Sequence, residues 1–217
     1  MEKDWLLKTL FFKTLPSTQI HLKELLKNDS QELPLAIVSD IQTDGIGSRD
    51  NRWISKEGNL FLSFAIKLEE LPKDLKLESA SIYFSYILKE TLEEFGSTVF
   101  VKWPNDLYIN RSKIGGMITN IVGDVLVCGV GLNMQKTDEV FASLDIEIDK
   151  KKLLEKYFTN IEKVSLWKQV FSKYKLNFQT NQKFFTHING IKVSLSEAVL
   201  EDDGSLNING QKVYSLR

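Results

Sequence analysis

The sequence predicts an α+β protein: a mixed β-sheet with helices on one face, followed by a small C-terminal β-module. Apolar runs of strand length are interspersed with segments of helical periodicity. Near the end of the chain, two Asn-Gly pairs follow apolar residues in similar segments, a strong signal for hairpins, and Asp203-Gly204 is a third candidate turn. We expect residues 1–180 to form the main domain. Residues 181–217 should form a β-barrel-like module that packs on it, because a module of this size is not stable alone.

Composition and charge are those of an ordinary globular protein. The 28 basic and 29 acidic residues leave a net charge of −1, and 42% of residues are hydrophobic. Near-neutrality argues against a dedicated nucleic-acid binder, and no apolar run is long enough to span a membrane. The single cysteine, Cys128, excludes an intramolecular disulfide, and with only two histidines a His/Cys metal site is not expected. We therefore expect a cytoplasmic protein with neither nucleic-acid nor membrane partners.

Each expected element depends on a local pattern. In the first half, apolar runs predict strands at 10–14, 35–39 and 59–67. Ser17 is a suitable N-cap for a helix that includes Leu26, and 77–95 has the periodicity of an amphipathic helix. Further strands are expected at 98–102, 106–109, 113–122 and 125–132, the last two joined as a hairpin by Gly123-Asp124. A helical stretch follows over 150–181, with a break expected near 159–160.

The polar, glycine-bearing segment 40–57 is long for a connection inside a compact domain, and such loops are usually functional or mobile. It lacks the third, correctly spaced glycine of a dinucleotide-binding loop, so that match fails. Its backbone N–H groups, Arg49 and Arg52 are suited to wrap an anionic ligand, and Trp53 is suited to cover one. In isolation, the segment is more typical of a charge-balanced surface loop.

Three further clusters combine small and polar residues at strand ends. The run KWPND at 102–106 predicts a rigid corner: either a β-turn with a buried tryptophan, or a site where Asp106 holds a metal or orients an amine. Lys113 precedes the glycine pair 115–116, which suggests a point charge beside a ligand that approaches the backbone closely. The run GVGLN at 129–133 again places small residues before an amide. Together these clusters suggest a site for an anionic, purine-like ligand.

Five segments occur in an order and spacing that a known family shares: Ser17-Thr18-Gln19, the loop 42–53, KWPNDLY at 102–108, KIGGMI at 113–118 and GVGLN at 129–133. Together they resemble the biotin protein ligases, which join biotin to a lysine of a carrier domain. The resemblance covers nearly the whole chain. It implies a class II synthetase-like catalytic fold with an SH3-like C-terminal module.

The resemblance also implies an activity: that of a biotin–[acetyl-CoA-carboxylase] ligase. ATP and Mg²⁺ would activate biotin as biotinyl-AMP, and the biotinyl group would pass to a lysine of a biotin carboxyl carrier protein, a subunit of acetyl-CoA carboxylase. The DNA-binding helix-turn-helix of repressor-type members is expected to be missing, which agrees with the neutral charge. The sequence leaves the oligomeric state open, a homodimer included.

Residue by residue, the resemblance assigns two ligand-binding groups and three catalytic positions. The implied biotin-binding residues are Ser17, Thr18, Gln19, Gln42, Gly45, Ile46, Gly47, Lys113 and Gly116. The implied ATP-binding residues are Arg49, Trp53, Asn105, Asp106, Lys113, Leu132, Asn133 and Arg217. Lys113, Asp106 and Arg49 are the implied catalytic residues, and no protein-held metal is expected. Lys113 would stabilise the reacting carboxylate and phosphoryl group, and Asp106 would orient or deprotonate the carrier lysine.

Two departures from the family pattern stand out. Gln19 occupies a position where the family has asparagine. The loop carries Ile46, Ser48, Asp50 and Asn51 where many members have glycine and arginine. We therefore expect a loop that is held less firmly by charge, and faster release of biotinyl-AMP than in arginine-rich relatives.

Two other functions are consistent with parts of this pattern. A lipoate-type protein ligase or acyltransferase would share the fold and a catalytic lysine. The KWPND corner, Gln42 and the β-tail favour biotin, since a cyclic urea needs hydrogen-bonding groups whereas a dithiolane needs mostly apolar contact. A non-catalytic biotin-binding module would keep the pocket without turnover. The presence of Lys113, Asp106 and Asn133 argues against it.

Overall fold

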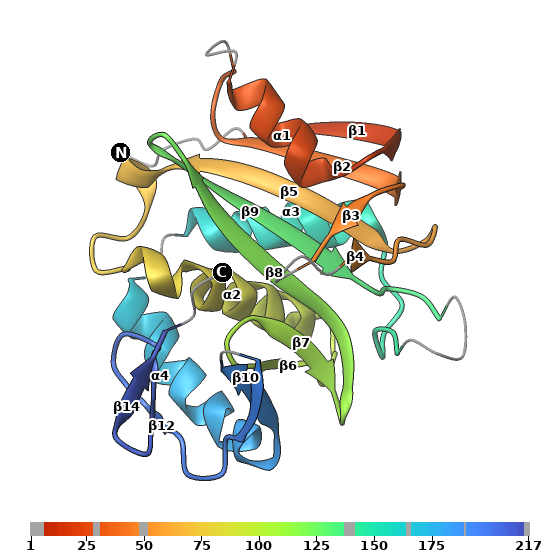
Figure 1. Ribbon diagram of the computed structural model, residues 1–217. Coiled ribbons are helices and arrows are strands. Elements are labelled where there is room, and N and C mark those ends of the chain that lie inside the picture. Colours follow the sequence, from red (N-terminus) through yellow and green to blue (C-terminus); the bar gives the residue numbers. More distant parts are fainter. Residues whose placement is uncertain are drawn as a thin grey trace.

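A computed structural model describes residues 7–27, 31–47, 52–136, 142–163, 166–188 and 190–214 (Figure 1). The strands are β1 (Lys8–Leu15), β2 (Leu35–Gln42), β3 (Gly45–Ile46), β4 (Arg52–Trp53), β5 (Leu60–Lys67), β6 (Phe100–Lys102), β7 (Asp106–Ile109), β8 (Ser112–Val122), β9 (Val125–Leu132), β10 (Phe185–Ile188), β11 (Ile191–Ser194), β12 (Val199–Leu200), β13 (Leu206–Ile208) and β14 (Gln211–Val213). The helices are α1 (Thr18–Leu26), α2 (Ala80–Glu94), α3 (Lys150–Glu162) and α4 (Trp167–Phe178), with single 3₁₀ turns at Leu68–Glu70, Leu77–Ser79 and Gln179–Lys183. Among the described residues, no helix combines the length and apolarity needed to cross a bilayer.

A seven-stranded mixed sheet forms the centre of the molecule, which confirms the expected fold class. Its strand order is β1-β2-β5-β9-β8-β7-β6. β1 runs parallel to β2, and the other neighbouring pairs are antiparallel. The predicted hairpin between β8 and β9 is present, with Val122 paired to Val125 across the turn. Because side chains alternate along a β-strand, successive residues of each strand point to opposite faces of this sheet.

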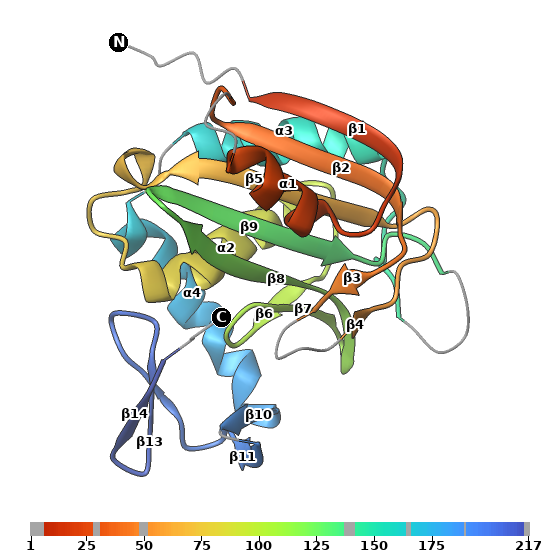
Figure 2. The ribbon, with the colours of Figure 1, turned by 45° about the horizontal axis from the view of Figure 1, so that its top comes forward.

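The helices lie on both faces of the sheet, not on one as expected (Figure 2). On β2, Ala36 and Val38 join the larger core cluster, which contains buried residues of α2, α3 and α4. Leu35 and Ile37 point the other way and pack with Leu22 of α1. The continuous apolar run of β2 agrees with burial on both faces, but such a run does not say which element covers each face.

Two boundaries differ from the sequence expectation. The segment 40–57 is not wholly a loop, since β2 extends to Gln42 and β3 pairs with β4. The helical break falls after α3 rather than at 159–160. Asn160 stays inside α3 because its amide donates hydrogen bonds to Thr91 and Glu94 of α2. At the start of α4, Asp74 accepts hydrogen bonds from the backbone N–H groups of Trp167 and Lys168.

The C-terminal strands form two small sheets that pack against the main domain. As expected, β10 pairs with β11 in antiparallel fashion, the Asn-Gly turn at 209–210 joins β13 to β14, and Asp203-Gly204 lies in the turn between β12 and β13. Asn189 lies outside the described residues. Leu200 and Leu206 belong to the same core cluster as α2 and α4. Trp167 Nε1 donates to the Asp202 carbonyl at 2.9 Å. These contacts confirm the expected packing of the tail. A boundary at residue 180 stays a prediction.

The tail and α4 also support the KWPND corner. β6 is the last strand of the sheet, and its outer edge is covered by side-chain amides instead of another strand. Asn177 exchanges two hydrogen bonds with the backbone of Val101, and Asn181 bonds both Val101 O and Trp103 N. The Trp103 indole is buried and donates to Gly204 O at 2.8 Å. The buried tryptophan that we expected for a β-turn at this corner is therefore present.

Candidate active site

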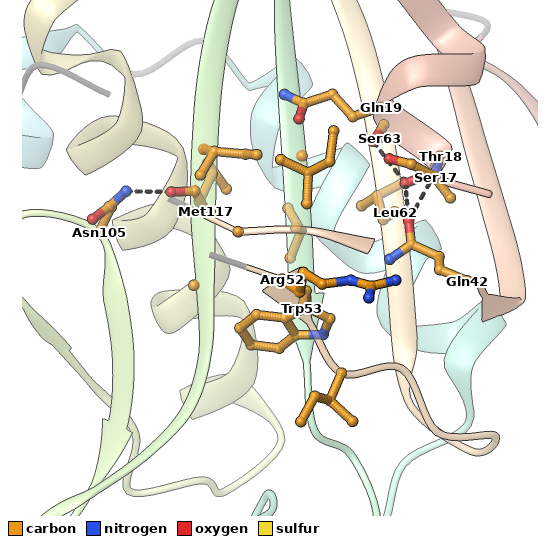
Figure 3. Close-up of a pocket in the computed structure, with 18 of the residues that line it drawn as sticks. Ser17, Thr18, Gln19, Gln42, Arg52, Trp53, Leu62, Ser63, Asn105 and Met117 are labelled. Atoms are coloured by element: carbon orange, nitrogen blue, oxygen red, sulfur yellow. Dashed lines mark hydrogen bonds between the residues drawn. The ribbon is translucent and has the colours of Figure 1, made fainter. Parts of the chain in front are cut away.

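A cavity of about 330 Å³ opens on the sheet face that carries α1. The residues that line it are Ser17, Thr18, Gln19, Gln42, Ile46, Gly47, Arg52, Trp53, Ile54, Leu62, Ser63, Asn105, Asp106, Lys113, Gly116, Met117, Ile118, Gly129, Val130, Gly131 and Asn133. The cavity thus lies on the face of the sheet and extends from the start of α1 to β7. Figure 3 shows the labelled residues arranged around it, with Arg52 and Trp53 contributed by β4.

One end of the cavity is a polar cluster at the start of α1. Ser17 caps the helix by accepting from Ile20 N. Gln42 Oε1 accepts from Thr18 N at 2.8 Å and from Thr18 Oγ1 at 3.1 Å, and Gln42 Nε2 donates to Ser55 Oγ at 3.3 Å. The hydroxyls of Thr18 and Ser63 are 2.8 Å apart (Figure 3). Because these groups hold one another, the cluster presents hydrogen-bonding groups in set positions.

The floor of the cavity is made of glycines on β8 and β9. Gly116 pairs with Gly131 across these strands, and Gly129 lies two residues before Gly131 on the same face. A Cβ on Gly131 would lie 2.5 Å from Trp53 Cε2, so the indole rests directly on the glycine backbone. Trp53 Nε1 is buried and has no hydrogen-bond partner within the part of the chain that the structure describes. The glycines therefore make room for a flat ring above the sheet.

The resemblance to the biotin protein ligases implies that Trp53 binds ATP, so we expect Gly131→Ala to weaken nucleotide binding, because the added methyl group collides with the indole of Trp53. The expected result is a rise of about tenfold in the KM for ATP, on the scale of one lost good contact. A double-mutant cycle with Trp53→Ala checks the cause. In the Trp53→Ala background, the Gly131 substitution should have little further effect. An equal penalty in both backgrounds would contradict the steric explanation.

The other end of the cavity holds a carboxylate between two lysines. Asp106 Oδ1 lies 2.7 Å from Lys113 Nζ, and Asp106 Oδ2 lies 4.0 Å from Lys102 Nζ. The side chains of Asp106 and Lys102 are 15% and 13% exposed, whereas that of Lys113 is 39% exposed. Of the two lysines beside Asp106, Lys113 is therefore the more accessible, and it is the one able to turn toward a ligand. Burial, with a smaller contribution from the charge of Asp106, raises the pKa of the neighbouring Tyr108 to about 12.

The strand register explains why the ion pair fits. Asp106 pairs with Gly116 across β7 and β8. A Cβ on Gly116 would lie 3.2 Å from Asp106 Oδ1 and 3.5 Å from Lys113 Nζ, so glycine leaves space for both charged groups. Asn105 is buried, and its side-chain amide donates to the Met117 carbonyl while Met117 N donates back to Asn105 O. Asn105 thereby ties the corner to β8 and sets the position of Asp106.

The structure brings most of the predicted site residues to this cavity. Gly45 and Leu132 are not among those that line it. Leu132 packs in the larger core cluster on the opposite face, and Gly45 lies behind Trp53, where a Cβ would meet the Trp53 carbonyl at 2.7 Å. Arg49 and Arg217 fall outside the described residues, as do Ser48, Asp50 and Asn51 of the loop.

Several lining residues were given no individual ligand role from sequence: Ile54, Leu62, Ser63, Met117, Ile118, Gly129, Val130 and Gly131. Arg52, which was expected to help wrap an anionic ligand, does line the cavity. The alternation of side chains along a strand was a usable signal for Gly129 and Gly131, which point to the same face as each other. Ser63 had no such signal, because it lies in a continuous apolar strand. Cys128 points away from the cavity and is fully buried, which raises the pKa of its thiol and agrees with a packing role.

Comparison with known proteins agrees with this geometry. Residues 11–133 match the model of the "Biotin/lipoate A/B protein ligase family". The chain belongs to this family. The match spans the sheet from β1 to the end of β9 and includes the described residues that line the cavity. The family assignment therefore covers the candidate site itself.

Solved structures extend the similarity to nearly the whole chain. The biotin acetyl coenzyme A carboxylase synthetase of Helicobacter pylori, crystallised with bound biotinylated ATP, is 38% identical, with a TM-score of 0.92. The alignment covers 96% of this chain and 99% of that one. The biotin protein ligase of Aquifex aeolicus, in complex with biotin and ATP, is 23% identical over 97% of this chain and 96% of that one, with a TM-score of 0.79. The second likeness shows the shared fold.

Curated members of the family match over a shorter region. The bifunctional ligase/repressor BirA of Escherichia coli is 34% identical over 106 residues, which are 46% of this chain and 32% of that protein. BirA of Bacillus subtilis is 30% identical over 142 residues, 61% of this chain and 42% of that protein. The matched region thus spans less than half the length of these curated relatives.

Proposed function

We propose that this chain is a biotin protein ligase that uses ATP to join biotin, through biotinyl-AMP, to a lysine of a biotin carboxyl carrier protein. The observation that carries the proposal is a single cavity with two chemically distinct ends. A cluster of hydroxyl and amide groups at Thr18 and Gln42 suits a cyclic urea. The Lys113–Asp106 pair suits a carboxylate that reacts with a phosphate. The full-length similarity to the Helicobacter pylori synthetase supports the same assignment.

In the first half-reaction, the biotin carboxylate attacks the α-phosphorus of ATP and pyrophosphate leaves. Both reactants are anionic, so a cation at the point of attack lowers the barrier. Lys113 fills this role: its side chain is partly exposed and lines the cavity, so its ammonium group can turn from Asp106 to the ligand. The indole of Trp53 above Gly131 offers a flat surface for the adenine ring.

In the second half-reaction, a neutral lysine amine of the carrier attacks the acyl carbon of biotinyl-AMP, and AMP leaves. When Lys113 turns to the ligand, Asp106 Oδ1 becomes available to accept a hydrogen bond from the incoming amine. Lys102 stays beside Oδ2 and keeps a positive charge near the carboxylate. Asp106 is thus placed to orient the amine and to take its proton. We propose that the segment from Gln42 to Trp53, including Arg49, covers the mixed anhydride and limits hydrolysis.

Mg²⁺ enters this scheme as part of the nucleotide substrate. Among the described residues, no three His, Cys, Asp or Glu side chains are grouped to hold a metal ion. The ATP phosphates themselves are suitable ligands, since Mg²⁺ commonly binds phosphate oxygens and water with one or two carboxylates. We therefore propose that MgATP is bound as a unit.

The test is a ligation assay with the purified protein, MgATP, biotin and a carrier domain. We expect the carrier to gain the mass of one biotinyl group, with one pyrophosphate released per transfer. Lipoate in place of biotin should give little product, because a dithiolane ring has no N–H or C=O group to pair with the polar cluster at Thr18 and Gln42. Faster transfer of lipoate would make the chain a lipoate-type ligase. Biotin binding without pyrophosphate release would make it a binding module.

A further inference from the structure

Three side chains form a hydrogen-bonded series that begins outside the cavity and ends at its wall. Lys23 Nζ, on the second turn of α1, donates to Asn120 Oδ1 at 2.9 Å. The same Oδ1 accepts from Gln19 Nε2, also at 2.9 Å. Gln19 is buried and lines the cavity, whereas Asn120 is exposed and Lys23 is half-buried. The series therefore connects a half-buried charge outside the cavity to a buried amide of the binding site.

The direction of these hydrogen bonds is determined by chemistry. A lysine ammonium group has three donors and no acceptor, so the atom of Asn120 that faces it must be the oxygen. The atom of Gln19 that faces this oxygen must then be its NH₂ group. The Gln19 oxygen is left on the other side, toward the rest of the pocket (Figure 3). Lys23 thus determines which end of a buried amide the cavity presents.

The surroundings of Gln19 give this orientation a consequence. Gln42 is engaged at both ends of its amide by Thr18 and Ser55. Gln19 Oε1, by contrast, receives no hydrogen bond from any described residue. Gln19 Cδ lies 3.3 Å from the position that a Cβ would occupy at Gly129, so the amide packs on the cavity floor. Its oxygen is an available acceptor for a ligand N–H at this end of the cavity.

We propose that Lys23 and Asn120 are positioning residues for biotin recognition, which hold Gln19 with its oxygen toward an N–H of the ligand's cyclic urea. The proposal rests on the proposed function for the identity of the ligand. Loss of the Lys23 donor frees both amides to rotate by half a turn. In the rotated state Gln19 presents NH₂ to the urea N–H, two donors meet, and a ligand hydrogen bond is lost.

The test compares the biotin KM and kcat of four variants. Lys23→Met should raise the biotin KM about three- to tenfold, with the KM for ATP and kcat unchanged. Lys23→Arg, which keeps a donor without an acceptor, should restore the wild-type KM. Lys27→Met is the matched control: it removes an exposed lysine from the end of the same helix and should change nothing. Asn120→Asp keeps an acceptor facing both partners and should stay within about twofold of wild type.

The outcomes separate this proposal from the proposed function. If the wild-type protein fails to ligate biotin, the proposed function fails, and the positioning role for biotin fails with it. If the wild type is active and Lys23→Met matches Lys27→Met in biotin KM, the positioning role is wrong. A fall in kcat and in the affinity for both substrates, together with a lower melting temperature, would also overturn it, because that pattern indicates general loss of structure.

Discussion

Replacement of Lys113 by alanine is expected to slow biotinyl-AMP formation by about 100- to 1000-fold, the usual cost of losing a well-placed group that stabilises charge in a transition state. The structure explains why the second lysine beside Asp106 would not compensate. Lys102, the other lysine beside Asp106, is only 13% exposed and lies 4.0 Å from the far carboxylate oxygen. The measurement is pyrophosphate release with biotin and MgATP in the absence of carrier, which isolates the first half-reaction.

Two controls make this result interpretable. Lys67→Ala removes an exposed lysine whose nearest carboxylate, on Glu69, is 3.8 Å away, and it should leave the rate unchanged. Thermal unfolding of Lys113→Ala should show a folded protein, since Lys113 is partly exposed and its loss creates no buried cavity. Full pyrophosphate release by a folded Lys113→Ala protein would contradict the assignment of Lys113 as the cation at the reacting carboxylate.

Asp106→Asn is expected to separate the two half-reactions. Asparagine has nearly the same shape as aspartate but cannot take a proton from the attacking amine, so transfer to the carrier should fall by about 100-fold or more. Adenylate formation should fall much less, because Lys113 remains present to contact the ligand. The measurement supplies preformed biotinyl-AMP and carrier to the enzyme in a single turnover, next to the pyrophosphate assay.

The control for this substitution is Asp40→Asn, which changes an exposed carboxylate that pairs with Lys150 at 3.1 Å outside the cavity. It should affect neither half-reaction. If Asp106→Asn slows both half-reactions equally, the carboxylate acts through the position of Lys113 and not on the carrier amine. If it slows neither, Asp106 has no part in the chemistry.

The local elements of the fold were predictable because short-range patterns determine them. Ser17 begins α1 as an N-cap, β10 pairs with β11, and the turn at 209–210 joins β13 to β14 as its Asn-Gly pair predicts. The break between α3 and α4 was placed wrongly, because Asn160 is held by Thr91 and Glu94 of α2. A contact between two helices about 70 residues apart leaves no local trace in the sequence.

The candidate site was predictable in its residue types and only in part in its geometry. Lys113, Asp106 and Gly116 were expected to belong together, and the register of β7 with β8 places Asp106 beside Gly116. Leu132 was assigned to the same site from its place in the motif, yet its side chain faces the opposite core. Membership in a motif does not specify the face of the sheet to which each side chain points.

The sequence by itself determined the element types, the hairpin turns, the family and the chemical groups available for the reaction, since each depends on residue identity and short spacing. Tertiary structure alone decided that α1 covers the second face of the sheet, that Trp53 lies on Gly131, and that Lys23 reaches Gln19 through Asn120. These contacts join residues that are far apart in the chain. They exist because β5, β9 and β8 lie side by side under α1, and strand order is a property of the folded sheet.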